Sequence, residues 1–312
     1  MTALVVALAS LPCVYWTHGV ETKAQLDAAS ITRICVPAEQ AERWRAAGVE
    51  ATPVTAAALA ARNVLPAPGI AARAGLASPT RAPWIVANGW QFQRDPAGKY
   101  AYQVPVGKAA LAAAEAFAYG ADALLQIDPA DLGAAGAMLT FLAGLPPATP
   151  QPIADLAVVD DGSPAAGEVM NLLARRNLLF ERVTAPSSRY RINVALGSRD
   201  YPAGDAADPS AFALKIRRAL TDDERTLRVY GSETVIARLT GDAQRVRLHL
   251  LNYAGRDIQG LRIRLRGVYR EATARVDGAG TVALQDYVAA ADATEFSVPT
   301  LSTYAVIDLD RR

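Results

Sequence analysis

The sequence predicts an α/β body followed by a small all-β C-terminal domain. Strand-like and helix-like segments alternate through the first half, at about 20 residues per unit. A proline-rich segment, Leu145 to Pro152, then reads as a linker. After Leu227 the hydrophobic period falls to two, as in half-buried strands. These observations predict two α/β regions and one β region.

The composition is that of a globular protein with enough apolar residues for a core. The chain has 312 residues, of which 51% are hydrophobic and 20% charged. This length suits about two or three domains. The net charge is only +1, so the chain has no general attraction for nucleic acid or for an anionic membrane. We therefore expect neither as a partner.

The first 150 residues contain apolar runs bounded by helix stop signals. Gly107 to Tyr119 is the clearest helix, because it is rich in alanine and is followed by Gly120. Residues 64 to 83 are expected to form a loop, and 91 to 104 a hairpin around the Asp95–Gly98 turn. The other strands are predicted at Pro12–Thr17, Ile31–Val36, Val49–Val54, Trp84–Trp90 (strand and turn) and Ala123–Ile127, and the other helices at Glu21–Ala29, Ala38–Ala47, Ala56–Asn63 and Ala130–Leu142.

The second half begins with another α/β stretch and ends in strands. Strands are predicted at Ala154–Val159, Leu178–Val183 and Tyr190–Leu196, with helices at Ala165–Asn177 and Pro209–Leu220. Short strands separated by Gly-containing turns predict an antiparallel β-sandwich. The seven predicted strands are Thr234–Leu239, Val246–Asn252, Leu261–Leu265, Ala272–Val276, Thr281–Ala283, Thr294–Val298 and Tyr304–Leu309.

The run LHLLNYAGRDIQGLRIRLRG, residues 248 to 267, resembles the terminal β-domain of multidomain glycoside hydrolases. The section from Ala154, with its DDG turn, is similar to the flavodoxin-like, amidotransferase-like domain between barrel and sandwich, as in beta-galactosidase trimerisation domains. The resemblance implies three domains. They are a shortened or degenerate (β/α) barrel-like domain at 1–148, a flavodoxin-like α/β domain at 149–228 and a β-sandwich at 229–312. A complete barrel needs about 250 residues, so the N-terminal part departs from the pattern.

Two cysteines and two histidines limit other chemistry. Cys13 and Cys35 lie in the first two predicted strands, where one disulfide is conceivable. With only His18 and His249 and no metal-ligand spacing, neither a metal site nor a cofactor is expected. The apolar run Ala3 to Leu11 is either a signal remnant or a buried strand. Localisation stays open, and a periplasmic or secreted location is favoured over a cytoplasmic one.

Two clusters of aromatic and polar residues are candidates for sugar binding. Tyr15, Trp16, His18 and Glu21 lie where the first strand ends, and Trp84, Asn88, Trp90 and Gln91 surround a second strand end. Parallel α/β folds bind ligands at the carboxyl ends of strands. Aromatic faces accept sugar C–H groups. The alternatives are that Trp16 packs under a loop, that Glu21 caps a helix and that the second cluster is a hydrophobic lid.

Glycoside hydrolysis ordinarily needs two carboxylates. Glu21 and Asp128 are the best pair for catalysis, although Asp128 is also suited to capping the next helix. Asp160 and Asp161 are a second pair, for which a turn before a helix is the stronger explanation. The sequence therefore predicts a carbohydrate-active, glycoside hydrolase-like protein. The alternative is a non-catalytic protein that binds glycan or assembles into a homo-oligomer.

Overall fold

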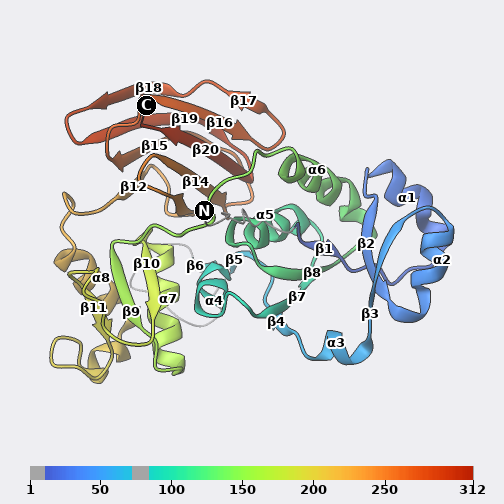
Figure 1. The fold of residues 1–312 in the computed structure, drawn as a ribbon, viewed down its shortest axis with the longest axis horizontal. Helices are drawn as coiled ribbons and strands as arrows, with labels where there is room; N and C mark the ends of the chain where they lie inside the picture. The colour runs from blue at the N-terminus through green and yellow to red at the C-terminus, as the bar shows by residue number, and fades with distance from the viewer. Residues whose placement is uncertain (1–10, 72–83, 312) are drawn as a thin grey trace, which may run out of the picture. The chain divides into compact units, whose positions relative to one another are not determined.

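The computed structural model describes residues 11–71 and 84–311 (Figure 1). These residues form two compact units. Unit 1 comprises 70–71, 84–94 and 148–311, and unit 2 comprises 11–69 and 95–147. The predicted apolar run Ala3 to Leu11 lies outside the described residues except for Leu11, as does the 72–83 part of the predicted loop.

Six parallel strands form the centre of unit 2. They are β1 (Cys13–Val14), β2 (Arg33–Pro37), β3 (Glu50–Val54), β4 (Asn63–Leu65), β7 (Lys99–Val104) and β8 (Asp122–Ile127). One sheet has the order β1-β8-β7-β4, and β2 pairs with β3. A parallel bridge between Tyr15 and Cys35 joins the two sheets. The resulting order is β3-β2-β1-β8-β7-β4. Strand β8, the last of these in the chain, therefore lies beside β1, the first.

Five helices accompany these strands: α1 (Lys23–Ala28), α2 (Ala41–Ala46), α3 (Ala56–Ala60), α5 (Ala109–Tyr119) and α6 (Leu132–Ala143). Helix α5 packs against α6, β7 and β8. It ends as predicted at Gly120, which adopts the left-handed conformation with φ of 65°. Helices α5 and α6 span 11 and 12 residues. No helix in the described part of the chain is long and apolar enough to cross a membrane.

The predicted hairpin over 91–104 is wrong. Gly89–Arg94 is helix α4, and Lys99–Val104 is strand β7, which pairs in parallel with β4 and β8. The N–H groups of Gln91 and Phe92 donate to the Asn88 carbonyl and begin the helix. The Asp95–Gly98 turn therefore joins a helix to a strand. The predicted loop also contains most of β4, as well as β5 (Gly69–Ala71), which pairs with β6 (Trp84–Val86).

The α/β part of unit 1 is built on a three-stranded parallel sheet. Its strands are β9 (Leu156–Val159), β10 (Phe180–Val183) and β11 (Asn193–Ala195), in the order β10-β9-β11. Helix α7 (Pro164–Arg175) begins at Ser163, whose hydroxyl accepts the Ala166 N–H at 3.1 Å. Helices α7 and α8 (Pro209–Ala219) contribute to the apolar core of this sheet, and α4 packs on α7.

Nine strands between Leu227 and Asp310 form two antiparallel sheets, coloured orange to red in Figure 1. One has the order β12-β15-β19-β18 and the other β13-β14-β20-β16-β17, and both contribute to a single apolar core. The sequence missed β12 and β18. The bounds are β12 (Leu227–Tyr230), β13 (Val235–Gly241), β14 (Arg245–Asn252), β15 (Ile258–Arg266), β16 (Glu271–Val276), β17 (Gly280–Val282), β18 (Gln285–Ala290), β19 (Ala293–Leu301) and β20 (Tyr304–Asp310).

The proline-rich segment continues into a stretch that follows edge strand β13. Ile153 N–H donates to the Leu239 carbonyl at 3.0 Å, and Gly241 N–H donates to the Gln151 carbonyl at 2.9 Å. Unpaired strand edges invite pairing with other chains. This segment therefore satisfies part of an edge that the sheet leaves open.

Candidate functional site

The first predicted cluster lies at the carboxyl edge of the parallel strands in unit 2. Strand β1 leads into Tyr15, Trp16 and His18, and β8 leads into Asp128. The two strands are parallel neighbours, with Val14 opposite Leu125. Their ends therefore lie at the same edge, where ligands collect in parallel α/β folds. We call Tyr15, Trp16, His18, Glu21 and Asp128 the strand-end site.

Trp16 supports the loop that carries His18. Its side chain is 1% exposed, and its indole N–H donates to Thr22 Oγ1 at 2.9 Å. The Thr22 hydroxyl in turn donates to the Gly19 carbonyl at 2.7 Å. The rings of Trp16 and His18 lie 4.6 Å apart, and His18 is exposed. This burial favours the structural interpretation of Trp16, and sugar contact by its ring stays a prediction.

Both predicted catalytic carboxylates are exposed. Glu21 lies in the 3₁₀ turn Val20–Thr22, where its carboxylate folds so closely over Gly19 that a Cβ there would overlap it. Asp128 caps the following 3₁₀ turn, because its Oδ1 accepts the Ala130 N–H at 2.8 Å. Capping occupies one oxygen of Asp128, and its catalytic role stays a prediction.

Glu39 and Gln40, which follow β2, also belong to this edge, and the sequence interpretation missed both. Gln40 Nε2 donates to the Thr17 carbonyl at 3.4 Å and so links the loops after β1 and β2. Burial raises the pKa of Tyr15, and the negative charge of Glu39 raises it further. The signal in the sequence was the polar pair Glu39-Gln40 directly after a buried strand.

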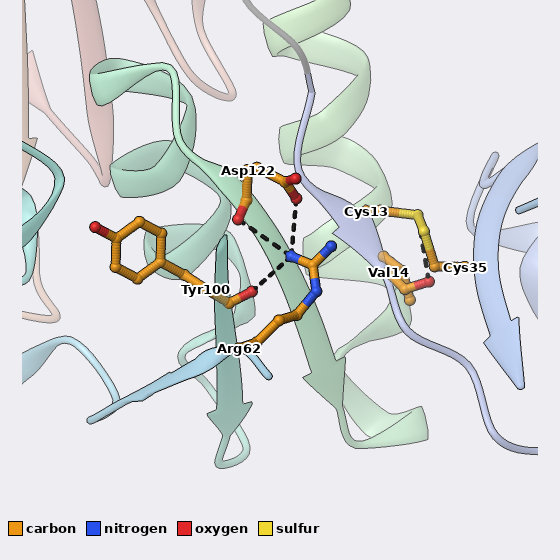
Figure 2. The surroundings of a disulfide bond; sticks show 6 residues. All are labelled: Cys13, Val14, Cys35, Arg62, Tyr100 and Asp122. Atoms are coloured by element: carbon orange, nitrogen blue, oxygen red, sulfur yellow. Dashed lines mark hydrogen bonds and ion pairs between the residues drawn. A yellow bond between two sulfur atoms is a disulfide. The ribbon is translucent and has the colours of Figure 1, made fainter. Parts of the chain in front are cut away.

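A disulfide and a small apolar cluster lie on one face of these strands. Cys13 and Cys35 are joined across β1 and β2, with a Cα–Cα distance of 5.8 Å, which confirms the pairing left open by the sequence (Figure 2). The apolar cluster consists of Tyr15, Cys35, Val54 and Leu124, with Cys13, Leu59 and Ala101 packed against it. The loop that the disulfide closes carries four of the five residues of the strand-end site.

The amino edge of the same strands has a structural network. A guanidinium N–H of Arg62 donates to the Tyr100 carbonyl at 3.0 Å, and to the carbonyl and Oδ1 of Asp122 at 3.2 and 2.8 Å (Figure 2). Arg62 therefore joins the starts of β7 and β8. In barrel-like folds this edge ordinarily contributes stability and the carboxyl edge contributes chemistry.

The buried acids of unit 2 have structural partners. Asp131, which is 5% exposed, accepts the N–H groups of Gly107 at 2.8 Å and of Lys108 and Ala109 at 3.3 Å. It therefore caps the start of α5. Glu115 of α5 is fully buried and accepts the Tyr102 hydroxyl at 2.6 Å.

The second predicted cluster lies in unit 1, along β6 and α4. The Arg175 guanidinium stacks over the Trp84 ring at 4.0 Å, and Trp90 packs against the core that contains α7. Asn88 is fully buried, and its Oδ1 accepts Gln91 Nε2 at 3.2 Å. These contacts make the cluster part of the packing of this unit. Its role as a sugar platform stays a prediction.

The described residues contain no cluster of side chains suited to binding a metal ion. Within 11–71 and 84–311, no three His, Cys, Asp or Glu side chains are grouped so that they could hold an ion. His18 lies at the strand-end site and His249 lies in β14.

The architecture defines a class of fold. No protein-family model and no curated protein matches the chain, but its multidomain fold, mixed α/β followed by antiparallel sheets, is similar to that of glycoside hydrolases. The alpha-L-fucosidase isoenzyme 2 of Paenibacillus thiaminolyticus is 11% identical with a TM-score of 0.50, and the match covers 70% of this chain and 61% of that one.

Two other solved structures are more distant. A rhamnosidase from Novosphingobium sp. PP1Y is 9% identical over 69% of this chain and 31% of its own, with a TM-score of 0.45. A beta-galactosidase from Rahnella sp. R3 is 8% identical over 88% of this chain and 63% of its own, with a TM-score of 0.42. The chain therefore spans less than two thirds of the length of each of these three structures. At these identities the likeness concerns the fold alone.

Proposed function

We propose that this chain is a carbohydrate-active, glycoside hydrolase-like protein that acts on or binds a glycan at the strand-end site of unit 2. The observation that carries the proposal is the parallel pairing of β1 with β8, which brings the His18–Glu21 loop and Asp128 to one edge. The parallel pairing of the strands of unit 2, with β8 beside β1, supports a shortened barrel-like domain at 1–148. A flavodoxin-like domain at 149–228 and a β-sandwich at 229–312 complete the proposed organisation.

The side chains at this edge suit glycoside chemistry. Two carboxylates serve as acid and base, or as acid and nucleophile, according to their separation. We assign these roles to Glu21 and Asp128. His18 is exposed beside them and can donate to or accept from sugar hydroxyls. Tyr15 lies one layer below, in the apolar cluster.

The experiment is a hydrolysis and binding screen of E21Q and D128N against the wild type. Aryl glycosides report turnover, with an aryl α-L-fucoside included because of the fucosidase fold, and calorimetry with neutral oligosaccharides reports binding. We expect each substitution to lower turnover at least 100-fold. E50Q is the matched control, because Glu50 is exposed at the amino edge. Turnover that is unchanged in both variants would remove the assigned pair.

A second function, glycan binding without turnover, is favoured by the exposure of both carboxylates. A general acid in a glycosidase ordinarily has an apolar setting that keeps it protonated near neutral pH. Glu21 and Asp128 both face solvent, and Asp128 also caps a turn. Binding in calorimetry without release of the aryl group would establish this alternative. The apparent mass in size-exclusion chromatography would test assembly into a homo-oligomer.

The Cys13–Cys35 disulfide favours a periplasmic or secreted location. Disulfides form and persist in oxidising compartments and are rare in the cytosol. Thiol alkylation of the protein in freshly lysed cells tests this location. Protein with both thiols blocked would argue against it.

A further inference from the structure

Two glutamine side chains face solvent from neighbouring interior strands of unit 2. Gln103 in β7 and Gln126 in β8 are register partners, and both are exposed. Strand β8 lies between β1 and β7, and β7 lies between β8 and β4. Interior strands of parallel sheets are ordinarily buried and apolar on both faces. An exposed amide pair at this position therefore marks an open, polar part of the sheet.

The strand alternation identifies the face on which the pair lies. Side chains two residues apart share a face. Leu124 and Ala101, two residues before the glutamines, belong to the apolar cluster described above. Tyr102 and Leu125 point to the opposite face, where both are fully buried and the Tyr102 hydroxyl reaches Glu115 of α5. The glutamines therefore lie on the face opposite α5.

The pair also lies next to the strand-end site. Leu124 and Gln126 in β8, and Asp128 directly after its end, follow one another at steps of two from the apolar cluster towards the carboxyl edge. Tyr15, from the strand-end site, belongs to the same apolar cluster. The amide pair is thus the layer between this cluster and Asp128.

We propose that Gln103 and Gln126 bind the hydroxyl groups of an uncharged glycan whose reacting or terminal end lies at the strand-end site. The inference rests on the proposed function and specifies the substrate class. A carboxamide offers two donors and an acceptor, and a sugar hydroxyl both donates and accepts. The amides carry no charge, so they complement a neutral sugar and give no compensation for the carboxylate of an acidic one.

The test is calorimetry of the full chain with L-fucose, galactobiose, xylotetraose and cellotetraose. The variants are Q103L, Q126L and the double variant, because leucine keeps approximate size and removes the amide. Q25L is the matched control on exposed α1. Losing one neutral hydrogen bond weakens binding up to about 10-fold. We expect about that loss for each single variant, about 100-fold for the double variant and none for Q25L.

The outcomes separate this inference from the function on which it rests. If the wild type binds a glycan, E21Q or D128N changes binding or turnover, and the double leucine variant binds like the wild type, the glutamine assignment is overturned and the function stands. If the wild type binds and turns over none of the probes, both fail. Thermal melts of all variants distinguish lost binding from lost folding. Should Q103L/Q126L unfold, Q103E and Q126E serve instead, and wild-type affinity in both overturns the assignment.

Discussion

Arg94 and Asp160 form a two-point ion pair in unit 1. Arg94 Nε donates to Asp160 Oδ2 at 3.0 Å, and Arg94 Nη2 donates to Oδ1 at 2.8 Å. The same Nη2 also donates to the Ser163 carbonyl at 2.9 Å. The Asp160 side chain is 3% exposed. The pair therefore fixes the end of α4 to the turn that starts α7, which explains why this aspartate follows β9.

This geometry predicts that Asp160→Asn destabilises the protein. Burial opposes ionisation, but hydrogen bonds from Arg94, Gly162 and Arg182 outweigh it and lower the pKa of Asp160. A lowered folded-state pKa contributes stability above the ordinary value near 3.8, and this is lost as the pH falls through the folded pKa. Removing one partner of a buried pair costs about 3 kcal/mol. Urea unfolding at pH 7 measures this loss.

Asp161→Asn is the matched control for that prediction. Asp161 is the exposed neighbour, and its carboxylate accepts the Ser163 N–H at 2.8 Å within its own turn. We expect this variant to lose less than about 1 kcal/mol. Equal losses in the two variants would show that the Arg94 pair contributes little. Neither variant should change glycan turnover per folded molecule.

The burial of His249 predicts that the protein loses stability in mild acid. The side chain in β14 is 5% exposed, and its Nδ1 lies 2.6 Å from the Tyr304 hydroxyl of β20. Burial lowers the pKa of His249 well below 6.5, and the positive charges of Arg238 and Arg247 lower it further. Asp308, also on β20, is paired with Arg247 at 2.6 Å, so its charge is already compensated.

The sign of this effect follows from proton binding. The unfolded chain takes up a proton near pH 6.5, whereas the folded chain resists it, so stability falls as the pH drops below about 6.5. We expect this group to add a slope of up to about 1.4 kcal/mol per pH unit. His249→Gln keeps a neutral polar group and should remove that part of the slope. The free energy of unfolding is measured by urea unfolding of wild type and variant between pH 7 and 5. The same dependence on pH in both proteins would contradict the assignment.

Substitution of Asn177 should destabilise the protein through two separate effects, lost hydrogen bonds and backbone strain, which two variants can distinguish. Its side chain donates to the Val235 carbonyl at 2.9 Å and accepts the Ala237 N–H at 2.7 Å, so it continues the hydrogen bonding of edge strand β13. Its φ is 53°, a left-handed conformation that costs most residues about 1 kcal/mol. Asn177→Gly keeps the backbone and loses both bonds, for about 2 kcal/mol. Asn177→Ala should lose about 1 kcal/mol more, and equal melting temperatures for the two would exclude backbone strain.

Much of the fold follows from local signals in the sequence. The helix ending at Gly120 and the alternating strand around His249 were predicted because their period and stop residues are strong. Helix α4 was missed because the turn at Asp95–Gly98 suits a hairpin as well as a helix–strand connection. Strand β18 was missed because it is a largely exposed edge strand with a bulge. In both cases the secondary structure depends on contacts with segments that are distant in the sequence.

The candidate site was predictable only in part. The strand-end rule located Trp16, His18, Glu21 and Asp128, because each follows an apolar run. It could not locate Gln103 and Gln126, since a polar residue inside a strand becomes informative only once the register places the two side by side. The second cluster was proposed from Trp84 and Trp90, but sequence alone does not reveal that these rings pack within unit 1.

The disulfide predicts that reduction will loosen the loop that carries the strand-end site. Strand β1 is only two residues long, and its link to β2 beyond the disulfide includes the Trp16 N–H bond to the Cys35 carbonyl at 2.8 Å. Cys13 and Cys35 are 22 residues apart, and a crosslink of that span contributes about 3 kcal/mol by restricting the unfolded chain. C13A/C35A, or the wild type under reductant, should lose about that much in urea unfolding. Reductant should have no effect on the double variant. Faster proteolysis between residues 14 and 34 should accompany the loss, because this is the segment that the crosslink encloses. If the reduced protein is as stable as the disulfide-bonded protein and is cleaved outside this segment, the constraint lies in another part of the chain.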